Sequence, residues 1–309
     1  MKHGVRLSGG VLSVLSLLTA CGGGGDVAST AVAKEPLSTI NYQSVTTAVV
    51  DSVAGSDSLT DSLELVTAAN VDSGSASLPA TTQPDTLVRY ALSQVRQFNT
   101  AKRVQSQSVS YENVTCHSGS LSVVVNDADN SNDASSGDIL TIQAFSCEAE
   151  AGLPVVSGEM TLVLGQVSFD YYGDLISGSM TMTLVNFGSS DVSFNGSAVV
   201  ALSSNAVSLD FNNLVASGGS TGRTLNYKMT VYSNGTASIA GPIEVDGSVY
   251  TLSTPVLVTS GTVNPTAGTV RIADGHGNRV DVVLSPTGYT GSLFLKGDEV
   301  VDESVAFGW

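Results

Sequence analysis

Apolar residues alternate with polar ones along most of the chain from Val104 to the C-terminus. The alternation is clearest in Gly178-Ser-Met-Thr-Met-Thr-Leu184, where every second side chain is apolar. Successive side chains of a β-strand point to opposite faces, so a period of two predicts strands with one buried face. Similar runs open with Gly158, Gly196 and Gly291, and each glycine is interpreted as the start of a strand. The pattern predicts about a dozen strands.

Tight turns separate these runs. Asn195-Gly196, Asn234-Gly235 and Asp246-Gly247 are pairs that accept the positive φ angles of a two-residue hairpin turn. Connections this short leave no room for the crossover that parallel strands need. We therefore predict a mainly β fold over residues 104–309, a long antiparallel meander. So many twisted strands are expected to curl into a barrel, a half-barrel or a sandwich.

The composition agrees with one β domain. The chain has 309 residues and 32 glycines, and only 13% of its residues are charged, which suits strands and turns better than helices. Its formal net charge is −16. A field of that sign repels nucleic acid and anionic lipid headgroups, so we expect no nucleic-acid partner.

Residues 37–103 follow a helical period instead, and we predict that this segment packs on the sheet. Apolar residues recur every three or four positions between Leu37 and Val53 and again between Leu59 and Val66, which predicts two short helices. A third helix is predicted over residues 85–98. Its apolar face consists of Leu87, Val88, Ala91, Leu92, Val95 and Phe98.

Residues 1–20 have the features of a secretory signal. Lys2 and Arg6 precede an apolar stretch that is too short to span a bilayer. The residues Leu18-Thr19-Ala20-Cys21 resemble the lipobox of bacterial lipoproteins. The resemblance implies cleavage before Cys21 and acylation of its sulfur, with palmitate among the attached chains. The alternative is a plain secreted protein in which Cys21 is an ordinary thiol.

The stretch 21–36 is rich in Gly, Ala and Ser, and we predict a flexible tether to the membrane. Gly22 follows the cysteine, in place of the Asp that retains many lipoproteins at the inner membrane. We therefore expect a lipid-anchored protein of the bacterial cell envelope, at the outer membrane.

Lipidation of Cys21 would leave an even pair of cysteines in an oxidising compartment. Cys116 and Cys147 are then predicted to form a disulfide. A closed zinc site is less well supported, because His117 and His276 are the only histidines that survive processing and such a site needs four nitrogen or sulfur ligands.

The loop between the two cysteines is acidic. Its side-chain oxygens recur at positions 1, 3, 5, 7, 9 and 12 of residues 127–138, the spacing of a twelve-residue calcium loop. Asn132 stands where that loop has glycine, Asp138 replaces the bidentate glutamate, and the flanks are predicted strands. The sequence thus predicts a weak Ca²⁺ site, with a merely solvated loop as the alternative. The predicted ligands are Asp127, Asp129, Ser131, Asp133 and Asp138.

The sequence offers few arrangements of residues that are typical of a catalytic site. His117 adjoins a cysteine, and His276 lies in Asp274-Gly-His-Gly-Asn278, which is predicted to be an exposed turn between strands. The sequence contains no P-loop or dinucleotide fingerprint. Its Gly-x-Ser-x-Gly match, residues 218–222, lies among the predicted strands and turns and not at the strained strand-to-helix elbow that the motif requires. We therefore expect no enzymatic activity and no organic cofactor.

The lipobox, Asn41-Tyr42-Gln43 and the Cys116–Cys147 hairpin together resemble a group of uncharacterised proteobacterial lipoproteins. The likeness extends through the glycine-initiated runs to Pro265-x-x-Gly268 and implies architecture without an activity. Two functions remain open: a structural or binding β module of the envelope, or a periplasmic carrier of an apolar ligand inside the curled sheet. The protein or apolar ligand that it would bind is left unidentified.

Overall fold

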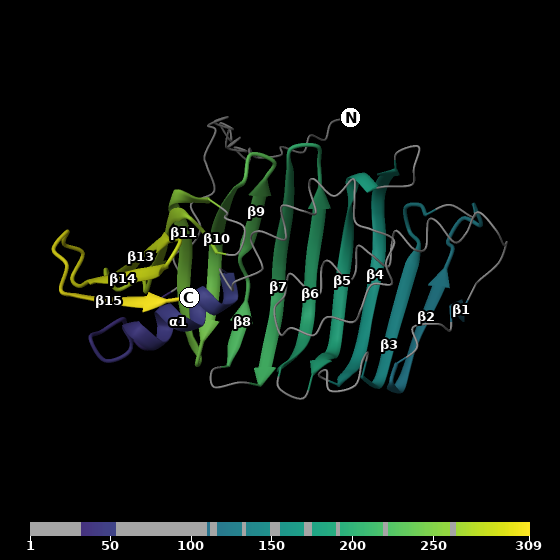
Figure 1. Ribbon diagram of the computed structural model, residues 1–309, viewed down its shortest axis with the longest axis horizontal. Coiled ribbons are helices and arrows are strands. Elements are labelled where there is room, and N and C mark those ends of the chain that lie inside the picture. Colours follow the sequence, from purple (N-terminus) through teal and green to yellow (C-terminus); the bar gives the residue numbers. More distant parts are fainter. Residues whose placement is uncertain are drawn as a thin grey trace, which may run out of the picture.

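The computed structural model describes residues 32–53, 110–111, 116–131, 134–148, 155–169, 175–189, 192–218, 222–259 and 264–309. Fifteen strands in these ranges form one antiparallel sheet, in which, with one exception, strands that are adjacent in the sheet are also consecutive in the chain (Figure 1). The mainly β, meandering fold predicted from the sequence is therefore confirmed. Two short strands, β8 and β9, share the place between β7 and β10.

The strands are β1 Ser110–Tyr111, β2 Ser118–Asn126, β3 Ile139–Glu148, β4 Val156–Phe169, β5 Leu175–Ser189, β6 Val192–Leu202, β7 Ala206–Gly218, β8 Arg223–Leu225, β9 Lys228–Tyr232, β10 Thr236–Val245, β11 Ser248–Thr259, β12 Ala267–Ala273, β13 Arg279–Ser285, β14 Gly288–Phe294 and β15 Glu303–Gly308.

The period of two in the sequence separates the two faces of the sheet. On β4 the side chains of Met160, Leu162 and Leu164 are buried, whereas Thr161 and Val163 between them face outward. The same division continues across the neighbouring strands, because the register aligns buried residues with buried residues. One face therefore carries the core and the other carries mainly Thr, Ser and Val.

One helix, α1 Tyr42–Val53, occurs in the described residues, and it confirms the first of the three predicted helices. The segments of the other two lie outside the described residues. The sheet curls at its C-terminal end, and α1 lies in the curl against β10, β13 and β14 (Figure 1). Tyr42, Val49 and Val53 are buried there.

Side chains of the sheet cap the C-terminal end of α1. The Tyr227 hydroxyl donates to the Ser52 carbonyl at 2.7 Å, and Arg223 Nη1 donates to the Ser52 hydroxyl at 3.1 Å and lies 3.5 Å from the Ala48 carbonyl. The last carbonyls of a helix have no partner within it, and a cation near them is favourable. These contacts fix the helix in the curl.

Two of the three predicted hairpin turns are confirmed: Asn234-Gly235 joins β9 to β10, and Asp246-Gly247 joins β10 to β11. The prediction for Asn195-Gly196 is wrong, because both residues lie inside β6. The interpretation of Gly158, Gly178 and Gly291 as strand starts is wrong in the same way, since β4 begins at Val156, β5 at Leu175 and β14 at Gly288. Several of these glycines mark β-bulges instead.

Three equivalent bulges cross the sheet in β2/β3, β4/β5 and β6/β7, and we call them the bulge line. In each, a glycine faces a residue of the next strand with a left-handed backbone, and the register shifts at the glycine. The pairs are Gly119 with Ser146, Gly158 with Asn186, and Gly196 with Asn213. A Cβ on any of these glycines would collide with the carbonyl oxygen of its partner.

Each bulge also directs the following side chain back into the core. Cys147, Phe187 and Leu214 come directly after the left-handed residues and are fully buried. The unpaired amide of the left-handed residue is bound by a side chain of the next strand, as when Asn186 N donates to Asn195 Oδ1 at 2.8 Å. A bulge thus re-aims a side chain while its backbone amide keeps a partner.

Gly196→Ala is expected to lower the free energy of unfolding by about 2 to 3 kcal/mol, because it adds both positive-φ strain and a collision with the Asn213 carbonyl. Gly235→Ala is the matched control: its φ is also positive, at 82°, but its Cβ would meet open space. We expect about 1 kcal/mol for the control. Urea unfolding of both variants measures the difference, and equal costs would contradict the role given to the bulge.

Candidate functional site

The acidic loop of residues 127–138 joins β2 to β3, as predicted, at the end of the hairpin opposite the disulfide. Backbone hydrogen bonds attach the loop to the next strand: Gly137 N donates to the Leu164 carbonyl at 2.8 Å, and Leu164 N donates to the Asp138 carbonyl at 2.9 Å. The described part of the loop is therefore hydrogen-bonded to β4 and continues the sheet.

Asp138 organises the loop. Its side chain is fully buried, and its carboxylate accepts the Ala128 amide at 2.9 Å and the Ser135 amide at 2.8 Å, one on each oxygen. A buried carboxylate is stable only when its oxygens accept hydrogen bonds of this kind. Asp138 thus holds the two limbs of the loop together.

Asp129 is exposed and accepts hydrogen bonds on both oxygens, from the Ser131 amide at 2.9 Å and from the Ser135 hydroxyl at 3.0 Å. The hydroxyl and amide of Ser131, followed by the Ser135 hydroxyl, lower the pKa of Asp129 to about 2. Since the folded pKa lies below the ordinary value, the stabilisation from these bonds is present at neutral pH and is lost as the pH falls toward 2.

Three of the five predicted calcium ligands lie together. Asp127, Asp129 and Asp138 each have one carboxylate oxygen within 4.8 Å of the others. Calcium–oxygen distances of about 2.3 to 2.6 Å allow ligands of one ion to lie up to about 5 Å apart, so the spacing fits. Ser131 is exposed on the same loop, and Asp133 lies outside the described residues. The site itself stays a prediction.

If the loop binds calcium with a dissociation constant of about 1 mM, about 10 mM calcium is expected to stabilise the protein by about 1.4 kcal/mol. Asp129→Ala should abolish the stabilisation without disturbing the fold, because Asp129 is exposed whereas Asp138 is a buried brace. Thermal unfolding with calcium, with magnesium and with neither ion measures the effect. A melting temperature of the wild-type protein that does not change on addition of calcium would contradict the calcium prediction.

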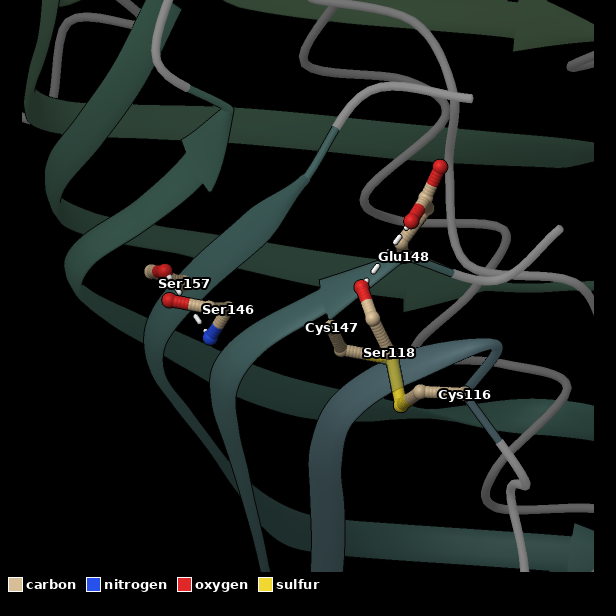
Figure 2. The surroundings of a disulfide bond; sticks show 6 residues. All are labelled: Cys116, Ser118, Ser146, Cys147, Glu148 and Ser157. Atoms are coloured by element: carbon tan, nitrogen blue, oxygen red, sulfur yellow. Dashed lines mark hydrogen bonds between the residues drawn. A yellow bond between two sulfur atoms is a disulfide. The ribbon is translucent and has the colours of Figure 1, made fainter. Parts of the chain in front are cut away.

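The predicted disulfide between Cys116 and Cys147 is present (Figure 2). Cys147 is fully buried because the first bulge turns its side chain inward. Hydrogen bonds hold the two strand ends beside it: the Ser118 hydroxyl donates to Glu148 Oε2 at 2.9 Å, and the His117 amide donates to the Glu148 carbonyl at 2.6 Å. The bond therefore closes the hairpin at the end away from the acidic loop.

A second polar cluster, which the sequence did not reveal as a site, surrounds Asp274. Its side chain is fully buried and accepts four hydrogen bonds. One oxygen accepts the amides of His276 at 2.7 Å and Asn278 at 3.0 Å. The other accepts the Leu37 amide at 2.9 Å and the Asn278 side-chain amide at 2.7 Å. Asp274 thus joins the turn between β12 and β13 to a segment near the N-terminus.

Further bonds extend this junction, which we call the clasp: residues 33–37 bound to residues 274–278. His276 Nε2 lies 2.8 Å from the Ala33 carbonyl, and the Ala33 amide donates to the Asp274 carbonyl at 2.8 Å. The Ser248 hydroxyl and the Tyr250 hydroxyl bind the backbone of Glu35. These residues belong to the stretch predicted as tether and to the start of the predicted helical segment, and they are fastened to the sheet.

The two candidate catalytic histidines lie in different surroundings. His276 is exposed in the predicted turn and its ring serves the clasp. His117 is exposed at the start of β2, beside the disulfide. The ring of His276 bonds to a backbone carbonyl and its amide donates to the Asp274 carboxylate, and both contacts belong to the clasp.

Within the described residues, no helix is long and apolar enough to cross a membrane. A comparison of the chain with protein-family models, curated proteins and solved structures finds no match. The resemblance to proteobacterial lipoproteins therefore stays a prediction that rests on the residues quoted above.

Proposed function

We propose that the protein is a lipoprotein of the bacterial cell envelope, anchored in the outer membrane by lipid on Cys21, whose folded part is a non-enzymatic structural or binding β module. The observation that carries the proposal is the lipobox Leu18-Thr19-Ala20-Cys21 behind a basic start and an apolar stretch. The envelope is oxidising, and a disulfide between Cys116 and Cys147 suits that compartment.

The clasp supports an anchoring role for the N-terminal segment. The point at which the chain after Cys21 is attached to the sheet decides which part of the sheet a lipid on that cysteine would hold closest to the membrane. The buried Asp274 provides that attachment, since it binds Leu37 by a charge-assisted hydrogen bond. Tension on the N-terminus would therefore act on the β12–β13 turn.

The experiment is to produce the full chain and its Cys21→Ala variant in a Gram-negative host fed with labelled palmitate. We expect label and membrane association in the wild-type protein and loss of both in Cys21→Ala. The double variant Cys116→Ser/Cys147→Ala is the matched control and should keep the label. Label in Cys21→Ala, or none in the wild-type protein, would overturn the proposal. Separation of inner from outer membranes on a density gradient tests the location.

No contact among the described residues favours the carrier alternative. In the described part of the curl, the space between α1 and strands β10, β13 and β14 is occupied by side chains such as Val49, Tyr227 and Val280, all fully buried. A carrier would need this apolar interior for its ligand. The envelope module is therefore the single function that we propose.

A further inference from the structure

Four exposed aliphatic side chains lie on segments that meet at the clasp, and we call them the aliphatic tip. Val32 is 61% exposed, Ile40 93%, Val300 67% and Val301 48%. Single exposed aliphatic residues are common on soluble proteins, but a group of them on adjoining loops needs a reason.

Hydrogen bonds place these segments side by side. Val32 precedes Ala33, whose carbonyl binds His276, and Ile40 follows Leu37, whose amide binds Asp274. The loop that carries Val300 and Val301 is joined to the same turn, because the Lys296 amide donates to Asn278 Oδ1 at 2.9 Å. Three segments that are distant in the sequence thus expose aliphatic side chains around one turn.

The length of chain between Cys21 and the clasp indicates which surface covers the aliphatic tip. Cys21 and Ala33 are twelve residues apart in the sequence, which corresponds to about 40 Å at full extension. A lipid on Cys21 therefore keeps the clasp near the bilayer. β12 ends at the clasp turn and β13 begins there, so both strands lead away from the turn.

We propose that the aliphatic tip inserts into the headgroup region of the membrane to which the lipid on Cys21 anchors the protein. The clasp end of the sheet then faces the membrane. The inference rests on the proposed lipid anchor and adds the surface that contacts the bilayer. Val32, Ile40, Val300 and Val301 enter the interface as a second, weak anchor beside the acyl chains.

The strand register gives the orientation of the rest of the molecule. The clasp, the turn at Asp246-Gly247 and the disulfide lie at the same end of the sheet, because β2, β4, β6 and β11 begin there. The acidic loop of residues 127–138 lies at the other end (Figure 1). The orientation thus directs the three clustered aspartates away from the lipid surface and toward solvent.

Charge selects the kind of lipid surface. Lys34 and Lys296 are exposed at the tip, but Asp298, Glu299 and Asp302 lie on the same loop as Lys296. Arg279 neutralises one of these acids through a 2.6 Å ion pair with Glu299. Glu35, also exposed on the clasp, brings the remaining acids to three against two lysines, so the tip fits a zwitterionic lipid surface better than an anionic one.

The test uses the full, lipidated chain reconstituted into phosphatidylcholine vesicles, with an environment-sensitive fluorophore on a single introduced thiol. The tip position is Val301→Cys, and the matched control at the opposite end is Ser204→Cys in the exposed turn between β6 and β7. We expect the Val301→Cys label to brighten, to shift to the blue and to be quenched by headgroup-attached quenchers. The Ser204→Cys label should show none of these changes. Equal behaviour of the two labels, or no change at the tip, would overturn the orientation.

Charged variants separate the tip from the lipid anchor. Ile40→Asp combined with Val300→Asp should remove the quenching of the Val301→Cys label while the protein still floats with the vesicles. Val163→Asp, an exposed valine on β4, is the matched control and should leave the quenching intact. Quenching that survives the tip variant would contradict the inference. Failure of the wild-type protein to float would instead contradict lipidation, so the two proposals fail by different readouts.

Discussion

Replacing Asp274 by alanine is expected to lower the free energy of unfolding by about 3 to 5 kcal/mol. The variant loses four hydrogen bonds to a buried carboxylate and leaves the amides of Leu37 and Asn278 without acceptors. Each buried donor left unpaired costs about 1 to 3 kcal/mol, and bonds to a charged group are stronger than neutral ones. The sum places this carboxylate among the most sensitive positions of the protein.

The effect should be local as well as global. Urea unfolding followed by the fluorescence of Trp309, the single tryptophan, gives the free energy. Hydrogen exchange of the Leu37 amide reports whether the clasp opens before the sheet unfolds. The control is His276→Ala, which removes one contact, to the Ala33 carbonyl, at an exposed residue and should cost about 1 kcal/mol or less. Similar losses in both variants would show that Asp274 does not organise the clasp.

Removal of the disulfide is expected to cost about 3 to 4 kcal/mol, because the bond closes a loop with a sequence separation of 31 and so restricts the unfolded chain. The combination Cys116→Ser with Cys147→Ala suits the site, since Cys147 is buried and a hydroxyl there would lack a partner. The hydrogen bonds of Glu148 to His117 and Ser118 stay in place and keep the strand ends paired.

Reduction of the wild-type protein provides the control for the disulfide. Dithiothreitol should move the urea midpoint of the wild-type protein toward that of the double variant and leave the double variant unchanged. A shift much smaller than the expected one would mean that the unfolded chain already keeps the ends of this hairpin close. In that case the paired strands, rather than the covalent bond, would define the hairpin.

The strands and their order follow from the sequence because both depend on local properties. Alternation along Gly178–Leu184 is a property of one strand, and short connections decide which strand comes next. The disulfide was predictable because, once Cys21 is assigned to the predicted lipid, Cys116 and Cys147 are the two cysteines that remain. The carboxylates of Asp127, Asp129 and Asp138 converge because one short loop carries all three.

The errors have a different origin. Asn195-Gly196 has the composition of a hairpin turn, but Asn195 instead binds the amide of Asn186 on the neighbouring strand and Gly196 makes room for the Asn213 carbonyl. A dipeptide carries no information about these cross-strand partners. The clasp was missed for the same reason, because Leu37 and Asp274 are 237 residues apart in the sequence. No local pattern relates an apolar residue near the N-terminus to an aspartate in a distant turn.

The clasp has a consequence for the order in which the protein folds. Apart from β8 and β9, which both pair with β7 and β10, each strand of the meander pairs with the next one along the chain, so the sheet can grow by closing one short loop at a time. The clasp cannot form until β12 and β13 exist, because the turn between them supplies Asp274. A chain made from its N-terminus therefore completes residues 33–37 early and docks them late. Among the described residues, the segment that is synthesised first therefore binds to the sheet only after the C-terminal strands have formed.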